Sequence, residues 1–268
     1  MIETAITAVA VYSLFEPYWL KIKQLELDSE KIPASFDGKT IIFISDIHCG
    51  KSFSLNRVRG LVKKINRLRP DIIILGGDYI SHDEGIILPV FKELKKLKPT
   101  IATFGVLGNH DCECDIELSR KGMRDAGIKS LDNRGCWVSV GDERIRLGGV
   151  CDQKAGPQDI GPTLEETTPE DFKVLISHNP SFISKVPEDS IDFMLSGHTH
   201  GGQIAPLGLL APLVPLSKGG AKVRHRRGVV DQNGVKMFVS SGVGTVILPM
   251  RLMSNPEIVY ITLKRFLA

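Results

Sequence analysis

Apolar runs that end in polar residues are the feature of this chain that most constrains its fold. Three of them lie in the first half, at residues 39–46 (KTIIFISD), 71–78 (DIIILGGD) and 100–111 (TIATFGVLGNHD). Continuous apolar runs of this length are typical of strands buried on both faces of a parallel sheet. Helices are predicted between and after them, over residues 55–68, 84–97 and 115–126. Because strands alternate with helices, the sequence predicts an α/β fold.

The second half of the chain is richer in strand patterns. The segments CWVSV and ERIRLGGV flank Gly141-Asp142, a pair typical of a hairpin turn. Further strands are predicted at residues 172–178, 192–198, 235–242 and 257–263. The chain has no internal repeat, low-complexity segment or linker. We therefore expect residues 1–268 to form one domain, with helices packed on a central sheet or on a pair of sheets.

Residues that can bind metal ions follow five of these predicted strands. The candidate ligands are Asp46, His48, Asp78, Asn109, His178, His198 and His200, with His110 and Asp111 beside them. Ligands of α/β sheets bind at the carboxyl ends of the strands, so side chains distant in sequence can converge there. Imidazole, carboxylate and amide groups suit divalent Mn, Fe, Zn or Ni. The seven candidate ligands are enough for two four-ligand shells that share Asp78.

Each of these motifs has an ordinary structural explanation when it is taken alone. An Asp-x-His or Gly-Gly-Asp after a strand is common turn chemistry, and a histidine pair can simply lie on the surface. Their combination, in this order and each at the end of a strand, indicates a metal site. His82 and His225 follow no such strand, and we expect them to be solvated.

The same series of motifs resembles the calcineurin-like metallophosphoesterase superfamily, over residues 40–203. The resemblance implies a four-layer αββα sandwich, with two mixed sheets flanked by helices. It also implies two metal ions, one held by Asp46, His48, Asp78 and His200, the other by Asp78, Asn109, His178 and His198. In this family pattern His110 binds no metal. It faces the phosphate and either stabilises the transition state or protonates the leaving oxygen, and Asp111 orients it.

The resemblance implies hydrolysis of a phosphoester or a pyrophosphate, in the manner of a phosphodiesterase. Two alternatives stay open. The first is a broad-specificity soluble phosphodiesterase or nucleotidase, which can use the same site. The second is a scaffold that binds metal without catalysis, but every ligand position and His110 are filled by competent residues.

Two segments suggest a substrate at or near a membrane. Residues 204–216 are almost wholly apolar, and residues 218–227 are rich in Lys and Arg. This combination suits binding to an anionic lipid. The alternative is that the apolar part forms a partly buried cap over the sheet and the basic part a solvated loop. Residues 1–20 are expected to form a short apolar helix that either docks on the core, which we favour, or lies at a membrane surface. Residues 201–203 (GGQ), 240–245 and 249–258 further resemble a subfamily of membrane-associated phosphoesterases that includes a UDP-diacylglucosamine pyrophosphatase and the YkuE- and YaeI-like proteins.

Net charge and cysteine content narrow the possible partners of the protein and its cellular compartment. A net charge of +3 on 268 residues gives no argument for nucleic-acid binding. Five cysteines at irregular spacing, with no Cys-x-x-Cys pair, are typical of a reduced, cytoplasmic protein, which could still contact the membrane peripherally. Cys49 and Cys112 adjoin the candidate site, and we expect buried, inert thiols there rather than redox-sensitive ones.

Overall fold

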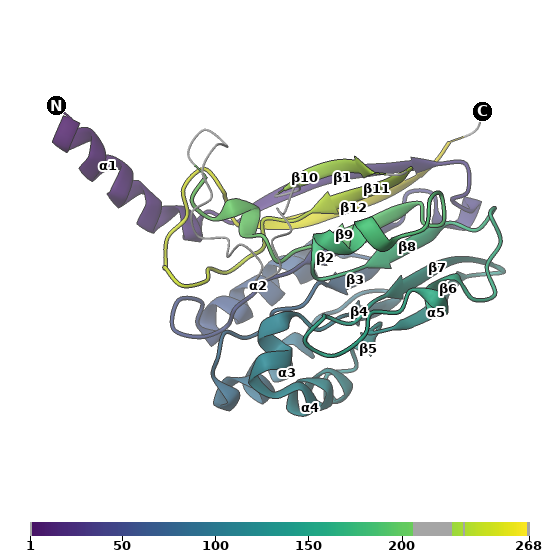
Figure 1. Cartoon of the computed structure of the whole chain (residues 1–268), viewed down its shortest axis with the longest axis horizontal. Coiled ribbons are helices and arrows are strands. Elements are labelled where there is room, and N and C mark those ends of the chain that lie inside the picture. The colour runs from purple at the N-terminus through teal and green to yellow at the C-terminus, as the bar shows by residue number, and fades with distance from the viewer. Residues whose placement is uncertain (1, 206–226, 233, 267–268) are drawn as a thin grey trace.

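Two six-stranded sheets form the body of the protein in the computed structural model, which describes residues 2–205, 227–232 and 234–266. The first sheet has the strand order β1-β12-β2-β3-β4-β5, and the second has the order β10-β11-β9-β8-β7-β6 (Figure 1). The strands of the first sheet are β1 (Lys21–Ser29), β2 (Thr40–Ile44), β3 (Ile72–Leu75), β4 (Ala102–Gly105), β5 (Lys129–Ser130) and β12 (Glu257–Arg265). Those of the second are β6 (Arg134–Val140), β7 (Glu143–Gly149), β8 (Lys173–Ile176), β9 (Phe193–Ser196), β10 (Gly228–Gln232) and β11 (Val235–Val239).

Both sheets are mixed. In the first, β2, β3, β4 and β5 run parallel, whereas β12 pairs with β2 in the antiparallel sense and carries β1 parallel to itself. In the second, β7, β8, β9 and β11 run parallel, and β6 and β10 close the two edges as antiparallel strands. The predicted hairpin at Gly141-Asp142 is confirmed as the connection between β6 and β7.

The main core lies between the two sheets. Phe43 and Ile74 of the first sheet and Ile176 and Leu195 of the second belong to one buried cluster. The alternate residues of β2 and β3, such as Ile42 and Ile73, point to the opposite face and pack under the helices. Both faces of these strands are therefore buried, which explains why their sequences are continuous apolar runs. That residues 1–268 make one domain stays our proposal.

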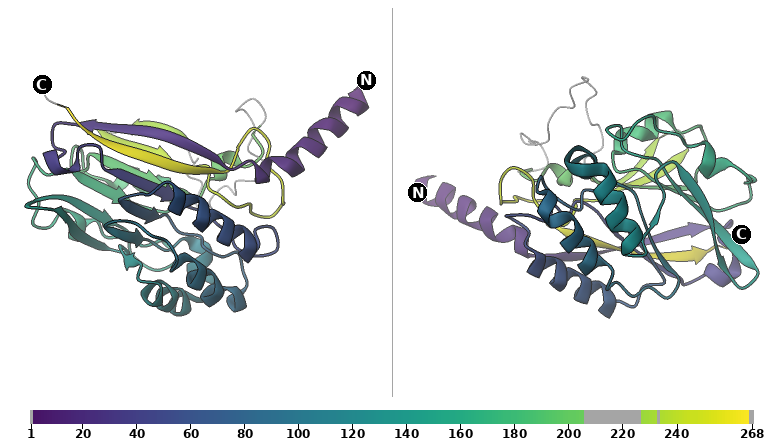
Figure 2. Two further views of the ribbon diagram at one scale, coloured as in Figure 1. Left: turned by 180° about the vertical axis from the view of Figure 1, so that it is seen from behind. Right: turned by 90° about the horizontal axis from the view of Figure 1, so that it is seen from below.

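Helices cover the outer face of each sheet, so the expected sandwich is confirmed. The first sheet is covered by α2 (Leu55–Arg67), α3 (Ile87–Leu94), preceded by the short turn η3 (Glu84–Ile86), and α4 (Asn109–Asp125). The second sheet is covered by shorter pieces, mainly η4 (Pro180–Lys185) and α5 (Gly161–Leu164) (Figure 2). Further short turns are η1 (Glu16–Tyr18), η2 (Ala34–Phe36) and η5 (His200–Gly202).

Helix α4 begins six residues earlier than the sequence pattern predicts. It is interrupted at Asp115, whose φ of −159° and ψ of 101° are not helical. The predicted start at residue 115 therefore corresponds to the second of two helical pieces, and the first piece has no apolar periodicity to reveal it. This difference matters for the site, because it places Asn109 and His110 in the first turn of a helix.

The N-terminal helix α1 (Ile2–Phe15) projects away from the body, so the prediction that it docks on the core is wrong (Figure 1). The side chains of Val9 and Phe15 are 49% and 58% exposed. The outer face of the first sheet is already covered by other helices, which leaves α1 no apolar face to pack against. Its last turn contacts the body, where the carbonyl of Ser13 accepts the backbone N–H of Arg251 at 2.9 Å.

Across residues 2–205, 227–232 and 234–266, the helices fall short of the length and apolar character that crossing a membrane requires. The apolar and basic segment predicted at residues 204–228 lies for the most part outside the described residues, as does His225.

Candidate metal centre

The nine candidate site residues meet at the carboxyl ends of five neighbouring strands. Asp46 and His48 follow β2, Asp78 follows β3, Asn109 to Asp111 follow β4, His178 follows β8, and His198 and His200 follow β9. The strands come from both sheets, so the site spans the mouth of the sandwich. Three overlapping groups of these side chains offer ligand atoms within 4.8 Å of one another.

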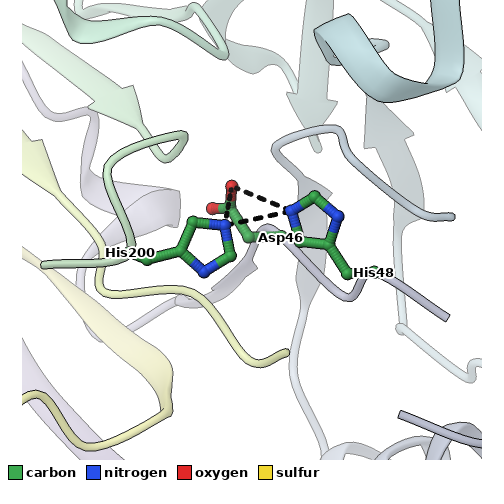
Figure 3. Close-up of side chains that lie close together, drawn as sticks. All are labelled: Asp46, His48 and His200. Atoms are coloured by element: carbon green, nitrogen blue, oxygen red, sulfur yellow. Dashed lines mark hydrogen bonds and ion pairs between the residues drawn. The ribbon is translucent and has the colours of Figure 1, made fainter. Parts of the chain in front are cut away.

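The first group consists of Asp46, His48 and His200 (Figure 3). The Nε2 atoms of the two histidines lie 3.0 Å apart. Oδ1 of Asp46 lies 3.5 Å from Nε2 of His200 and 4.0 Å from Nε2 of His48. All three side chains are at most 5% exposed. Two imidazoles and a carboxylate thus converge on one buried point.

The second group is built around His178. Its Nε2 lies 3.2 Å from Oδ2 of Asp78, 3.2 Å from Oδ1 of Asn109 and 3.2 Å from Nδ1 of His198. The same Oδ2 of Asp78 lies 3.4 Å from Nε2 of His48 in the first group. Asp78 therefore stands between the two groups and can serve both.

The donor atoms of this centre fit a cation. Nδ1 of His178 lies 2.8 Å from the carbonyl oxygen of Gly76 and must carry the proton there, because a carbonyl only accepts. When Nε2 of His178 carries no second proton, its lone pair faces the oxygens of Asp78 and Asn109. Lone pairs that face one another repel unless a positive charge lies between them. The residues present therefore suit divalent metal ions, with the hydrogen bond to Gly76 fixing the ring as in other metal sites.

The electrostatics of the buried histidines also favour metal binding. Burial lowers the pKa of His48 to about 3, against the opposing effect of the Asp78 carboxylate. Burial, and after it the charge of Arg251, lowers the pKa of His200 well below its usual value. Both rings are therefore neutral at pH 7, which is the form that binds a metal. At His178, burial acts in the same direction, but Asp78 outweighs it and raises the pKa, so a proton competes with a cation there.

The backbone at the candidate ligands is strained. Five of the seven have a positive φ, namely Asp46 (55°), His48 (45°), Asp78 (55°), His198 (69°) and His200 (51°). A non-glycine residue in this left-handed region costs roughly 1–2 kcal/mol, and such residues cluster at functional sites. The neighbouring chain leaves room only for glycine, because a Cβ on Gly108 would lie 2.2 Å from Oδ1 of Asp78.

His110 forms the third of these groups with His48 and Asp78, and the orientation of its ring has an unexpected source. Its Nδ1 lies 3.2 Å from the carbonyl oxygen of Ser81, which leaves Nε2 to exchange a proton. The expected contact of Asp111 with the His110 ring is replaced by another role. The carboxyl group of Asp111 accepts the backbone N–H groups of Asp78, Tyr79 and Gly108 at 2.7, 2.8 and 2.9 Å. It therefore holds the loop that carries Asp78.

Arg251 is a structural element of the site that the sequence pattern did not single out. Its side chain is fully buried and donates hydrogen bonds to the carbonyl oxygens of Ser241 and Gly244 at 2.8 and 2.6 Å and to that of His200 at 3.5 Å. Its charge is opposed first by Asp46, then by Glu257 and by the buried Glu16, which accepts the N–H of Ser254 at 2.7 Å. In the sequence, the one feature that could have indicated this role is an arginine at position 251 within an otherwise apolar segment.

The two cysteines beside the centre are consistent with inert thiols. Burial raises the pKa of Cys49 to about 12 and also raises that of Cys112. A thiol with a raised pKa carries little of the reactive thiolate form. All five cysteines are free.

Comparison with known proteins shows to which family the chain belongs. Residues 39–202, more than half of the chain, match the family model described as calcineurin-like phosphoesterase. The chain belongs to this family, and the resemblance noted from its motifs is confirmed. It is a metal-dependent hydrolase that acts on phosphoesters.

Three curated relatives illustrate the range of the family. The chain is 29% identical to the uncharacterized metallophosphoesterase YkuE of Bacillus subtilis, with 93% of this chain and 87% of YkuE aligned. It is 29% identical to phosphodiesterase YaeI of Escherichia coli, with 92% and 90% aligned. It is 30% identical to a transmembrane protein with metallophosphoesterase domain of Danio rerio, of which it spans 61% while 97% of this chain is aligned.

Proposed function

We propose that the chain hydrolyses phosphodiester or phosphoanhydride bonds with two divalent metal ions. In this proposal Asp46, His48, Asp78 and His200 hold the first ion, and Asp78, Asn109, His178 and His198 hold the second. The observation that carries it is the position of Asp78 Oδ2, which lies 3.4 Å from Nε2 of His48 and 3.2 Å from Nε2 of His178. Mn, Zn, Fe and Ni all accept such ligands.

The protein's own residues supply the rest of the reaction. Metal ions at this centre would polarise the phosphoryl group and make water a stronger nucleophile at neutral pH. Water oxygen forms the new bond to phosphorus as the bond to the leaving oxygen breaks. His110 gives that oxygen a proton from Nε2, while Ser81 holds Nδ1. His110 regains its proton from solvent. The name of the YaeI relative, phosphodiesterase, supports a diester substrate.

The first test is metal-dependent hydrolysis of bis-p-nitrophenyl phosphate and p-nitrophenyl phosphate. Protein stripped of metal should be inactive and should recover with Mn. His110→Ala should lose about 10²-fold or more in kcat while still binding metal, because it removes only the proton donor. His178→Ala should lose metal affinity as well. Asp231→Asn, on the exposed edge strand β10, is the matched surface control. Stoichiometric metal binding without turnover of either ester would favour the scaffold alternative.

We further propose that the substrate is a lipid-linked or membrane-proximal phosphoester, such as a UDP-diacylglucosamine-like pyrophosphate. Support comes from exposed apolar side chains near the centre. Ile247 is 70% exposed and Trp19 is 47% exposed. The loop that carries Ile247 is held by Gln203, whose Nε2 donates to the carbonyls of Val246 and Leu248 at 2.9 and 3.0 Å. Gln203 follows His200 by three residues, so this apolar loop adjoins the metal centre.

The N-terminal segment also carries exposed aromatic and basic side chains. Tyr18 is 65% exposed, and the exposed Lys21 and Lys23 follow it. Aromatic residues beside basic ones are typical of a helix that lies at the surface of an anionic membrane. We propose that the chain is a cytoplasmic protein that contacts the membrane peripherally through residues 1–20, and its free cysteines are in keeping with a reducing compartment.

The substrate proposal is tested by comparing micellar lipid pyrophosphates with soluble nucleotides. A lipid-linked substrate predicts a kcat/KM at least tenfold higher on the micelles. Deletion of residues 2–11, which keeps the contact of Ser13 with Arg251, should reduce that preference without changing hydrolysis of bis-p-nitrophenyl phosphate. Equal rates on both substrate classes, unaffected by the deletion, would favour the alternative of a soluble phosphodiesterase or nucleotidase.

A further inference from the structure

We propose that His82 is a further substrate-contacting residue, which binds the leaving-group side of the substrate next to His110. The proposal rests on the function proposed above, because it takes His110 as the residue that faces the leaving oxygen. It goes beyond that function by assigning a part of the site that recognises what is being released. From the sequence alone, His82 was expected to be merely solvated.

Three histidine rings lead from the buried centre to the surface. The ring of His48 is fully buried, and the ring of His110 lies 4.7 Å from it between centroids, at 89°. The ring of His82 lies 4.5 Å from that of His110, at 50°. His110 is half-buried and His82 is exposed. The only described histidine outside the metal groups thus lies directly outside the residue that protonates the leaving oxygen.

The backbone beside His82 is fixed rather than loose. The N–H of Ser81 donates to the carbonyl of Cys49 at 3.1 Å, and its hydroxyl donates to the carbonyl of His48 at 3.2 Å. The Ser81 carbonyl holds Nδ1 of His110 at 3.2 Å. These three bonds fix the residue that precedes His82. A contact made by the His82 side chain therefore has a defined place relative to the candidate ligands.

The position of the His82 side chain predicts which class of leaving group the site prefers. Because His110 is the proposed proton donor to the leaving oxygen, the leaving group lies on the His110 side of the phosphorus, and His82 contacts His110 on its outer side. An imidazole N–H can donate a hydrogen bond to an oxygen of that group, whether the ring is neutral or charged. The side chain of the acidic neighbour Asp83 is directed to the backbone, where its Oδ1 accepts the N–H of Gly85 at 3.0 Å. His82 therefore favours leaving groups that carry acceptor oxygens close to the scissile bond, as a second phosphoryl group does, over a plain aryl or alkyl group.

The test compares His82→Ala with wild type on two substrates. ADP-ribose has a phosphoryl leaving group, and bis-p-nitrophenyl phosphate has an aryl one. We expect kcat/KM on ADP-ribose to fall about tenfold, mostly through KM, as loss of one hydrogen bond to a charged acceptor predicts. On the aryl diester, the decrease in kcat/KM should be at least fivefold smaller than on ADP-ribose. His82→Gln, which keeps an N–H donor, should recover part of the loss, and Glu84→Ala in the same exposed loop should behave as wild type.

The possible outcomes are distinct. Equal losses on both substrates, with no recovery in His82→Gln, would mean that His82 merely supports the His110 ring, and the proposal would be wrong. No loss on either substrate would also overturn it. Metal titration and thermal unfolding of His82→Ala should match those of wild type, which separates substrate contact from a structural role. If wild type itself shows no metal-dependent hydrolysis of either substrate, the proposed function fails, not the assignment of His82.

Discussion

The carboxyl group of Asp111 accepts the backbone N–H of Asp78 at 2.7 Å, and so holds in place the residue that lies between the two ligand groups. The same side chain accepts the N–H groups of Tyr79, Ile80 and Gly108. One buried residue of helix α4 therefore ties the loop after β3 to the loop after β4. This relationship makes Asp111 important for metal binding without placing it among the ligands.

Replacement of Asp111 should separate stability from metal affinity. Asp111→Ala leaves buried N–H groups without acceptors, at about 1–3 kcal/mol each, and should unfold the metal-free protein readily. Asp111→Asn keeps one acceptor oxygen and should fold, with Mn affinity reduced about 10–100-fold because Asp78 is less firmly held. Calorimetric titration with Mn and urea unfolding measure the two effects. Wild-type Mn affinity in Asp111→Asn would contradict the prediction.

Arg251 should be essential for stability because its charge is buried. Arg251→Met would leave the carbonyls of Ser241 and Gly244 without their donors and would remove the positive charge that acts on Asp46, Glu257 and Glu16, and should destabilise the metal-free protein by about 3–5 kcal/mol in urea unfolding. Arg251→Lys keeps the charge but not the planar set of donors, so its loss should be smaller. If adding Glu16→Gln to Arg251→Met recovers none of the stability, the uncompensated charge of Glu16 is not the cause.

Ile247 should show a trade-off between stability and function. It is β-branched, has a φ of 62° and is 70% exposed, so the backbone is strained without any gain from burial. Ile247→Asn tolerates this conformation and should raise the free energy of unfolding by about 1 kcal/mol. If the exposed side chain contacts lipid, the same change should weaken hydrolysis of micellar substrates. Val229→Thr, at another exposed apolar residue, is the control and should affect neither property. A less stable Ile247→Asn protein would argue against strain.

Asp132 should make stability depend on pH. Burial raises its pKa from 3.8 to about 6, although the N–H of Leu107 and the hydroxyl of Ser130 oppose the rise. Between these values the folded state binds more protons than the unfolded state, so the free energy of unfolding falls as pH rises. Two pKa units correspond to at most about 3 kcal/mol.

The Asp132→Asn variant tests this pH dependence directly. Because Asn does not titrate, its stability relative to wild type should increase between pH 4 and pH 7 by up to the same amount. Urea unfolding of both proteins at the two pH values measures the difference, in which any pH-independent effect of the substitution cancels. A difference that stays constant between pH 4 and pH 7 would show that Asp132 titrates normally in the folded protein.

The sequence by itself determined the elements and the chemistry they carry. Strands buried on both faces must be apolar at every position, so the runs ending at Asp46, Asp78 and Asn109 were visible as strands. Polar residues are common after a strand, but metal-binding types recur here at the ends of five predicted strands, and this combination marked the candidate ligands. Parallel strands bring their carboxyl ends to one edge, so convergence at one site followed from the topology alone.

Only the tertiary structure decided how those residues meet. Which oxygen lies between the two groups, which carbonyl holds His110 and what surrounds Arg251 depend on contacts between segments far apart in the chain. Local patterns contain no information about such contacts. The same reason explains why the outward projection of α1 was missed, since an apolar helix docks only if the fold leaves an apolar face uncovered. His82 likewise looked like an ordinary exposed residue until folding placed it beside His110.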